Sequence, residues 1–133
     1  DHALDGLSKD LEKQLKTIAP KGFDVVLECT GNQAAATQAY GHLKKGSKMV
    51  IVAVGKMPAI DAFDFTSAEK EIIGTIMFRI EEFKAVIDYM GKGEIDVERF
   101  ASHIKLSDVQ SVMPELSAGT TETMKYMIDI SEN

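Results

Sequence analysis

One segment, residues 48–54, restricts the fold more than any other part of the chain. It reads Lys48-Met49-Val50-Ile51-Val52-Ala53-Val54, so every residue after the lysine is apolar. The run is far shorter than the roughly 20 residues that cross a bilayer. A strand without a polar face must be covered on both sides, as happens in parallel sheets flanked by helices. The segment therefore predicts a central strand of an α/β protein.

The segments around this run alternate between strand-like and helix-like patterns. Phe23–Glu28 is β-branched at its centre and bounded by turn residues, and Ile72–Phe78 resembles another strand. Strand, helix, strand, loop, strand, helix is the order that builds a parallel sheet with helices on its faces. Three helices are expected from apolar residues at helical spacing: one capped by Ser8 and carrying Leu7, Leu11, Leu15 and Ile18; one carrying Ala36, Ala39, Tyr40 and Leu43 and stopped by Gly46; and one with Phe83, Val86, Ile87 and Met90 as its buried stripe.

The last forty residues predict a smaller strand–helix–strand unit. Residues 102–106 and 124–130 alternate as half-exposed strands do, with Met124, Tyr126, Ile128 and Ile130 on one side of the second strand. Between them, residues 107–110 form a capping-box pattern that opens a helix. Pro114 is expected to kink or shorten this helix. The helix would place Val109, Val112, Met113 and Leu116 inside and end at Gly119.

Composition excludes several classes of protein. The 133 residues include 15 Lys or Arg and 21 Asp or Glu, and the resulting formal charge of −6 disfavours nucleic-acid binding through phosphate contacts. The single Cys29 rules out an intramolecular disulfide and cannot make a structural zinc site by itself. The N-terminal residues have neither the basic start nor the apolar stretch of a secretion signal. We therefore expect a cytoplasmic α/β protein that acts on neither nucleic acid nor membranes.

Ligands of open parallel sheets bind beyond the carboxyl ends of the strands, so the loops after Glu28, Val54 and Phe78 are the places to search. The first loop, residues 29–32, suits close approach of a nucleotide, although a simple turn capped by Asn32 or Thr30 fits equally well. The other chemical candidates favour structural interpretations. Cys29 has no identifiable histidine partner and is expected to be a buried thiol. No Gly-rich phosphate loop is present. His42 is expected to face solvent, His103 to be structural, and Glu69, Glu71, Glu81 and Glu82 to be solvated.

Several motifs occur in a specific order and spacing over essentially the whole chain. They are residues 22–31 (GFDVVLECTG), residues 43–52, residues 70–76, residues 93–96 with residues 102–106, and residues 1–5. Taken together, they resemble the medium-chain dehydrogenase/reductase family. In the same order, they resemble its fourth Rossmann strand, the following helix–glycine–strand passage, its sixth strand, its C-terminal motif and its third strand.

The resemblance is strongest to the zinc-dependent alcohol, polyol, butanediol and threonine dehydrogenases. It implies the second half of a Rossmann-type parallel sheet with flanking helices, plus a strand–helix–strand tail. It also implies hydride transfer between a secondary alcohol and NAD or NADP, with zinc polarising the oxygen. Residues 1–93 would be the C-terminal part of the nucleotide-binding domain, and residues 94–133 a tail packing with the catalytic domain. The zinc ligands and the Gly-rich pyrophosphate turn would precede residue 1, so no catalytic or metal-binding residue is expected in this segment.

The resemblance also assigns candidate cofactor contacts by matching position. Lys125 matches a basic residue near the C-terminus that reaches the cofactor pyrophosphate, although it fits a solvated strand residue equally well. The assignments are Thr30 and Gly31 after the fourth strand, Val52, Ala53 and Val54 at the end of the fifth, Gly74, Thr75 and Met77 at the end of the sixth, and Lys125.

Alternatives to the zinc-type dehydrogenase remain at this point. One is a zinc-free relative of the quinone or enoyl reductase kind, and another is an inactive truncated module that only self-associates. A methyltransferase is disfavoured, because its fourth strand would not end in Glu-Cys-Thr-Gly. The isolated chain is expected to lack dehydrogenase activity, and Gly31→Val to block cofactor binding. A homodimer or tetramer is expected through residues 72–78, and Ile76→Lys is expected to split it.

Overall fold

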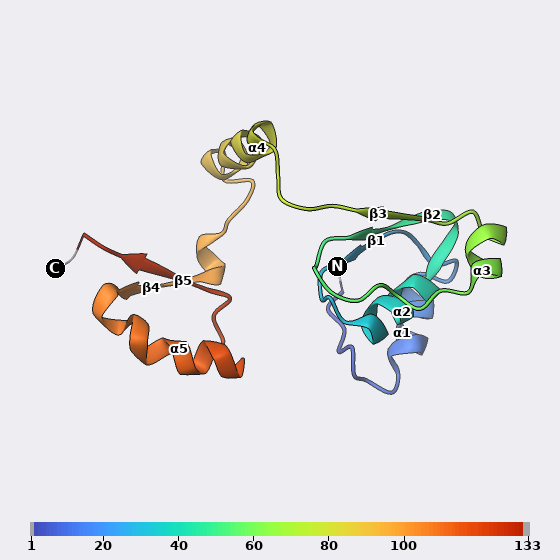
Figure 1. Cartoon of the computed structure of the whole chain (residues 1–133), viewed down its shortest axis with the longest axis horizontal. Coiled ribbons are helices and arrows are strands. Elements are labelled where there is room, and N and C mark those ends of the chain that lie inside the picture. The colour runs from blue at the N-terminus through green and yellow to red at the C-terminus, as the bar shows by residue number, and fades with distance from the viewer. Residues whose placement is uncertain (1, 132–133) are drawn as a thin grey trace. The chain divides into compact units, whose positions relative to one another are not determined.

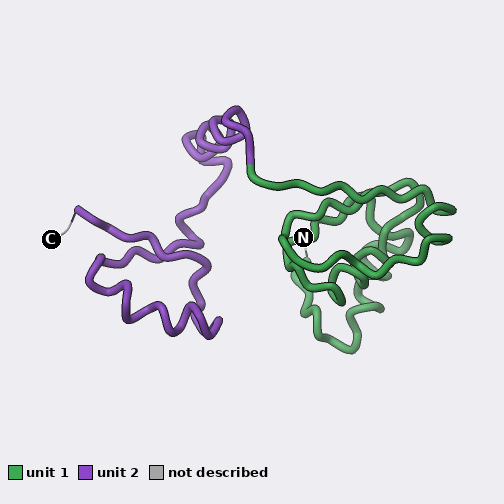
Figure 2. The backbone as a smooth tube through the Cα atoms, viewed as in Figure 1, with its two compact units in different colours: residues 1–77 green, residues 78–133 purple. Residues whose placement is uncertain are grey.

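The computed structural model describes residues 2–131, and the chain divides into two compact units (Figure 2). The first unit comprises residues 1–77 and the second residues 78–133. Each unit contains its own parallel sheet, as Figure 1 shows. The predicted α/β class, with a parallel sheet and a strand–helix–strand tail, is confirmed.

The first unit is built on a three-stranded parallel sheet in the order β1-β2-β3. Because β2 lies between the other two strands, residues 48–51 of the apolar run do supply the central strand. The strand ends at Ile51 rather than at Val54, so Val52, Ala53 and Val54 lie in the loop that follows it. Crossover connections containing helices join the strands, as parallel pairing requires. The elements are α1 (Leu11–Ile18), β1 (Phe23–Glu28), α2 (Gln33–Gly41), β2 (Leu43–Ile51), α3 (Ala62–Ser67) and β3 (Glu71–Gly74).

The core of this unit lies where β2 meets α2. Met49 in β2 is completely buried, and it packs with Tyr40 of α2 and with Leu43. Partly buried side chains from β1, α2, β2, β3 and the segment around α3 surround these three residues. They are Val26, Ala39, Ile51, Ile60, Phe65 and Ile72.

The boundary between α2 and β2 differs from the prediction. The helix ends at Gly41, so Leu43 is buried in the sheet rather than on a helix face. Gly46 does not stop a helix but lies inside β2 with φ of +69°. The register between β1 and β2 shifts over the same stretch, from Phe23 opposite Leu43 to Val25 opposite Lys48. A left-handed glycine within this irregular ladder lets β2 begin before the regular pairing starts.

Three other expectations in the first unit are wrong. The helix α1 begins at Leu11, so Leu7 lies before the helix and is 94% exposed. Ser8 is not the N-cap but lies in the preceding turn, where its Oγ accepts from Asp10 N. The third strand ends at Gly74 rather than at Phe78, and Met77 has φ of +60°. Residues 2–5 form no strand, since a strand requires a ladder partner, and Asp1 lies outside the described residues.

The second unit contains the predicted tail. Its strands β4 and β5 pair in parallel, from Ala101 opposite Lys125 to Lys105 opposite Asp129. The helix between them continues through Pro114, so the proline does not end it, and Gly119 terminates it with φ of +65°. The expected capping box is absent, because Ser107 Oγ donates to Asp108 Oδ1 instead. The elements are α4 (Ile80–Gly91), β4 (Ala101–Lys105), α5 (Val109–Ala118) and β5 (Lys125–Asp129), with 3-10 turns at Glu98–Phe100 and Leu106–Asp108.

The helix α4 occurs where the sequence predicts it, but its apolar stripe is not buried. The side chains of Phe83, Val86, Ile87 and Met90 are 40–51% exposed. Phe83 stacks on Phe78, with the ring centroids 5.4 Å apart. Within residues 2–131 no helix has both the length and the apolar character needed to cross a membrane.

Candidate functional site

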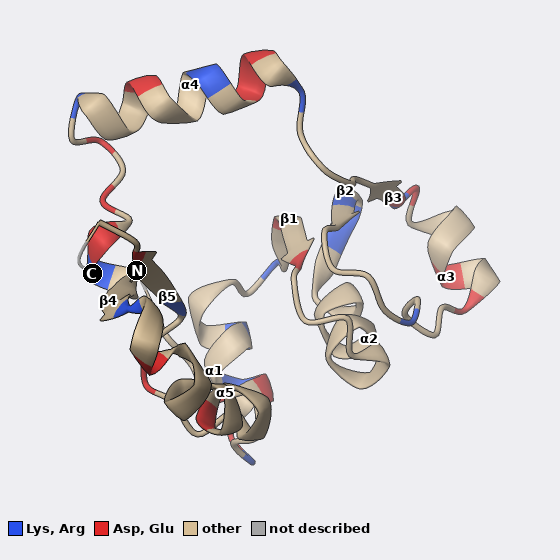
Figure 3. Ribbon diagram, turned by 60° about the vertical axis from the view of Figure 1, so that its left-hand side comes forward, with Lys and Arg blue, Asp and Glu red and all other residues tan. Residues whose placement is uncertain are grey.

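The carboxyl ends of the three strands of the first unit lie in one row. Glu28, the last residue of β1, is opposite Ile51 of β2, and Ile51 is opposite Gly74 of β3. Because the strands are parallel, the three loops that follow them leave the sheet at the same edge (Figure 3). This edge is where open α/β sheets bind their ligands. The candidate site is therefore the row of strand ends with its three loops.

The loops after β1 and β2 are tied to each other through their backbones. Val52 N and Ala53 N both donate to Glu28 O, at 2.8 and 3.1 Å. Further on, Lys56 N donates to Gly31 O at 3.3 Å. Gly31 has φ of +66°, and its backbone is so close to Gly55 that a Cβ on Gly55 would overlap it. Glycine at both positions is thus a requirement of the crossing itself.

This crossing changes the interpretation of the Gly31→Val experiment. A Cβ on Gly31 would lie 3.0 Å from Val54 O, and the positive φ would strain any side chain there. The substitution would therefore disturb the loop even without a ligand. Loss of binding in that variant would not distinguish a blocked ligand from a displaced loop.

A buried carboxylate that the sequence analysis did not single out lies at the end of β1. Glu28 is only 5% exposed, and its Oε1 accepts from Thr30 N at 2.8 Å, Thr30 Oγ1 at 2.5 Å and Gly31 N at 2.9 Å. The hydrogen bond from the Thr30 hydroxyl, helped by the two backbone donors, lowers the pKa of Glu28 although burial opposes this. In the sequence, the available signal for this carboxylate was an acidic residue at the end of a predicted strand, two positions before Thr30. Its significance depends on donors that only the folded loop supplies.

The first loop also forms the simple turn that the sequence left open. Asn32 caps α2, with its Oδ1 accepting from Ala34 N at 2.9 Å and from Ala35 N at 3.2 Å. Thr30 Oγ1 accepts from Asn32 N at 3.1 Å, so Thr30 links the cap to Glu28. Cys29, expected to be buried, is exposed.

The third loop is more open than the other two. Thr75 N donates to Ile51 O at 3.1 Å, which fixes the start of the loop beside the end of β2. Gly74 has no atom within 4 Å of the position a Cβ would occupy. Ile76 and Met77 are 78% and 82% exposed.

The first unit gathers all of the predicted site residues except Lys125. Thr30 and Val54 are exposed, Gly31 and Ala53 are half-buried, and Val52 is 45% exposed. Gly74 ends β3, and Thr75 and Met77 follow it at the same edge. Lys125 is an exposed residue at the start of β5 and belongs to the second unit. No group of three or more His, Cys, Asp or Glu side chains within residues 2–131 is arranged to hold a metal ion.

A second buried polar cluster lies at the opposite end of β3. Lys70, 8% exposed, donates from Nζ to Asp64 Oδ2 at 3.0 Å, and the Tyr40 hydroxyl donates to the same oxygen at 3.0 Å. The Lys70 ammonium also lies 4.4 Å from the centre of the Tyr40 ring. Burial, reinforced by Asp64, raises the pKa of Tyr40 to about 12. These contacts fasten α3 to the core, away from the row of strand ends.

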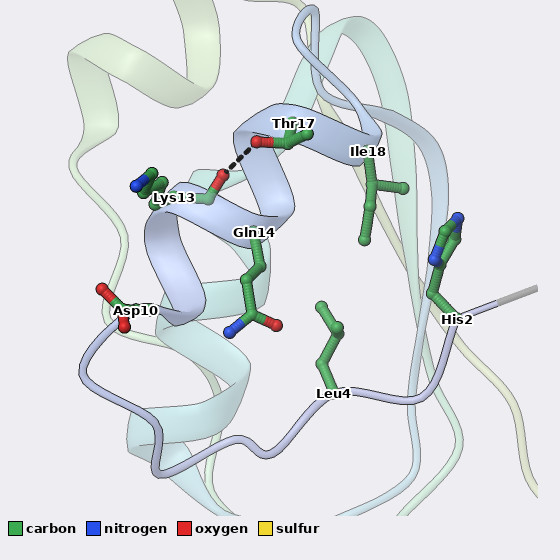
Figure 4. A pocket seen from close by; sticks show the side chains of 7 residues that line it. All are labelled: His2, Leu4, Asp10, Lys13, Gln14, Thr17 and Ile18. Atoms are coloured by element: carbon green, nitrogen blue, oxygen red, sulfur yellow. Dashed lines mark hydrogen bonds between the residues drawn. The ribbon is translucent and has the colours of Figure 1, made fainter.

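Two other sets of groups lie outside the row. One is a shallow pocket between the N-terminal segment and α1, whose polar side chains do not converge on one point (Figure 4). The pocket is lined by His2, Leu4, Asp10, Lys13, Gln14, Thr17 and Ile18.

The other is the contact between His42 and α1. The expectation that His42 faces solvent is wrong, since its side chain is 13% exposed and its Nε2 lies 3.1 Å from Glu12 Oε1.

The contacts of His103 in β4 lead us to expect that the stability of the second unit depends on pH. Its ring nitrogens lie 3.1 Å from Asp129 Oδ1 and 3.1 Å from Glu98 Oε2, and these carboxylates, Asp129 first, raise the pKa of His103 above 6.5. The stabilisation is complete below the unfolded-state pKa and is lost as the pH rises through the folded-state value. We expect the second unit to unfold at lower temperature at about pH 8.5 than at about pH 5.5. His103→Gln should reduce this difference and His2→Gln should leave it unchanged, as thermal melts at both pH values would show.

The fold and the site together define the class of protein. Three parallel strands in sequence order, with helices in the connections and loops gathered at the carboxyl edge, have the arrangement of one half of a Rossmann-type sheet. The chain belongs to the zinc-binding dehydrogenase family, whose profile matches residues 1–92.

Known proteins similar to the chain agree with this assignment. It is 29% identical over 111 residues to the 2-dehydro-3-deoxy-L-galactonate 5-dehydrogenase of Pseudoalteromonas atlantica, covering 82% of the chain and 32% of that protein. An alcohol dehydrogenase zinc-binding domain protein of Burkholderia ambifaria has the same fold, with a TM-score of 0.84, 18% identity and coverage of 98% of the chain and 36% of the other. A structure from Sinorhizobium meliloti 1021 that was solved bound to NADP gives a TM-score of 0.63 at 24% identity, over 84% and 32% of the two chains. The chain spans about a third of the length of the curated relatives it matches.

Proposed function

We propose that the chain supplies the cofactor-binding C-terminal portion of a zinc-type, NAD(P)-dependent alcohol or polyol dehydrogenase. The observation that carries this proposal is the row formed by Glu28, Ile51 and Gly74, from which all three loops of the first unit leave at one edge. Membership of the zinc-binding dehydrogenase family supports it, as does the relative named for a polyhydroxylated sugar acid. When bound, the nicotinamide would accept or donate the hydride.

The residues of the row fit a dinucleotide approaching from outside the sheet. Thr30 is exposed, and Gly31 presents backbone without a side chain. Open space at Gly74 leaves the backbone of the third loop accessible to a ligand amide. We assign the cofactor contacts to Thr30, Gly31, Val52, Ala53, Val54, Gly74, Thr75 and Met77, with Lys125 of the second unit for the pyrophosphate.

Zinc does not fit the described residues, because they offer no ligand group, and no step is derived through it. We assign the metal and the pocket for the alcohol to a catalytic domain outside residues 1–133. Residues 1–93 would then complete a nucleotide-binding domain, and residues 94–133 would pack with the catalytic domain. The chain covers only about a third of the length of these relatives, which supports this division.

Titration of the 133-residue chain with NADH and NADPH tests the proposal. We expect weak, saturable binding of at least one of them, with a dissociation constant on the order of 1 mM or below. ATP serves as the control ligand, because it has phosphates but no nicotinamide. No turnover of alcohols or polyols is expected from this chain by itself. Absence of saturable binding by both cofactors would contradict the proposal and favour an inactive self-associating module. Binding of NADPH by a full-length protein that has no zinc ligands would favour the quinone or enoyl reductase alternative.

We also propose that the chain assembles as a homodimer or tetramer through residues 72–78. Within the described residues, β3 pairs only with β2, so its other edge has no ladder partner. Ile73 and Ile76 are 40% and 78% exposed beside this edge, which makes it a template for another strand. Ile76→Lys is expected to shift the chain to monomer in light scattering. Leu7→Lys, which changes an apolar side chain that is 94% exposed elsewhere, should not. A parent chain that is monomeric at high concentration would rule out this assembly.

A further inference from the structure

We propose that Glu28 is a positioning residue that holds the first two loops of the row in the shape that receives the cofactor. Glu28 itself is nearly inaccessible, at 5% exposure, so it acts through the residues that it binds. The inference rests on the proposed function, because it assigns a task at the same site. It adds a residue that the positional assignment of cofactor contacts does not include.

The side chain of Glu28 fixes the loop after β1. One oxygen, Oε1, accepts three hydrogen bonds from the second and third residues after Glu28, two from Thr30 and one from Gly31. Hydrogen bonds to an ionised carboxylate are shorter and stronger than those between neutral groups. The lowered pKa of Glu28 agrees with an ionised acceptor. Together these bonds fix the backbone of the loop at Thr30 and Gly31.

The main chain of the same residue fixes the loop after β2. Glu28 O accepts from both Val52 N and Ala53 N, which are the first two residues beyond the end of β2. A single residue therefore sets the starting direction of two of the three loops. The backbone contact between Gly31 and Gly55 locks them further along, so displacement of one loop is transmitted to the other.

The hydrogen bonds continue from Glu28 to the start of α2. Thr30 Oγ1 donates to Glu28 Oε1 and accepts from Asn32 N, and the Asn32 side chain caps the helix. The position of the helix N-terminus relative to the row therefore depends on the carboxylate as well. Loss of the Glu28 acceptor would free the Thr30 hydroxyl to rotate and would loosen this connection.

Two substitutions of Glu28 separate the effect of losing the hydrogen-bond acceptor from the effect of losing the charge. Glu28→Ala removes the acceptor altogether, whereas Glu28→Gln keeps the length and one oxygen acceptor but removes the charge. Glu71→Gln is the matched control, since it makes the same change at an exposed acid in β3. Two measurements on the 133-residue chain are needed, amide hydrogen exchange resolved by residue and the dissociation constants for NADH and NADPH.

We expect exchange of the Thr30 and Gly31 amides to accelerate about tenfold or more in Glu28→Ala and less in Glu28→Gln, with the centre of β2 unaffected. The cofactor dissociation constant is expected to rise about tenfold in Glu28→Ala, with partial recovery in Glu28→Gln. A residue needed only for global stability would speed exchange throughout the sheet instead. If Glu28→Ala does not fold, Glu28→Gln alone decides the matter.

Unchanged exchange at Thr30 and Gly31 would show that Glu28 does not hold the loop. Faster exchange with unchanged cofactor affinity would show that the held shape is not used for binding. Either result would overturn the inference while leaving the proposed function intact. If the parent chain binds neither NADH nor NADPH, the proposed function fails first, and the inference fails with it.

Discussion

Replacing Met49 by alanine is expected to lower the free energy of unfolding of the first unit by about 2–5 kcal/mol. Met49 is completely buried in the central strand, and it contacts Tyr40 and Leu43, which are the other members of the core cluster. The smaller side chain would leave a cavity that the surrounding strands cannot fill without giving up their ladder bonds. Since small domains are stable by only about 5–15 kcal/mol, this loss is a large share of the total.

Met57→Ala is the matched control for Met49→Ala. It removes the same atoms from a side chain that is 52% exposed, so its effect should be within about 0.5 kcal/mol of zero. Urea unfolding of the parent chain and of both variants, followed by circular dichroism, measures the difference. Equal effects of the two substitutions would contradict the position of Met49 at the centre of the core.

A methyl group at Gly55 is expected to destabilise the first unit by about 1–3 kcal/mol or more. The Cβ of Gly55→Ala would overlap the backbone of Gly31, and backbone cannot rotate away as the end of a flexible side chain can. The crossing of the first two loops would have to open. We therefore expect the same variant to weaken cofactor binding, because both loops belong to the row.

Gly41→Ala is the control for Gly55→Ala. Gly41 ends α2, and a Cβ there would meet no atom within 4 Å, so the substitution should be neutral or slightly stabilising. Thermal melts of both variants, together with the cofactor titration, test the prediction. A Gly55→Ala chain as stable as the parent would mean that the two loops do not cross as described.

The strands were predictable because their signals are local. The run after Lys48 predicted the central strand, although this strand ends at Ile51 rather than at Val54, and Phe23–Glu28 has the same bounds in the structure as in the prediction. The start of β2 was not predictable, because Leu43 continues the helical spacing of Ala36, Ala39 and Tyr40. Only pairing with β1, which is distant in sequence, places Leu43 in the sheet.

The candidate site was predictable to the extent that strand ends determine it. Once the strands are parallel, the loops after Glu28, Ile51 and Gly74 must share an edge, whatever their residues. The burial of Glu28 was not predictable, because it depends on three donors that the folded loop turns back toward it. Lys70 was missed for a similar reason, since its partners Tyr40 and Asp64 come from two separate helices. The assignment of individual residues to the cofactor remains a prediction.

The parallel pairing in both units has a consequence for how fast the chain folds. The regular ladders begin at Val25 with Lys48, at Lys48 with Glu71 and at Ala101 with Lys125, which are 23, 23 and 24 residues apart. Each pair of strands must therefore close a loop of more than 20 residues before its first bond forms, and residues 2–131 contain no hairpin that could serve as a local nucleus. The chain must therefore give up much of its conformational entropy before the strands are held together, and until then both edges of the apolar segment Phe23–Glu28 are open to other chains.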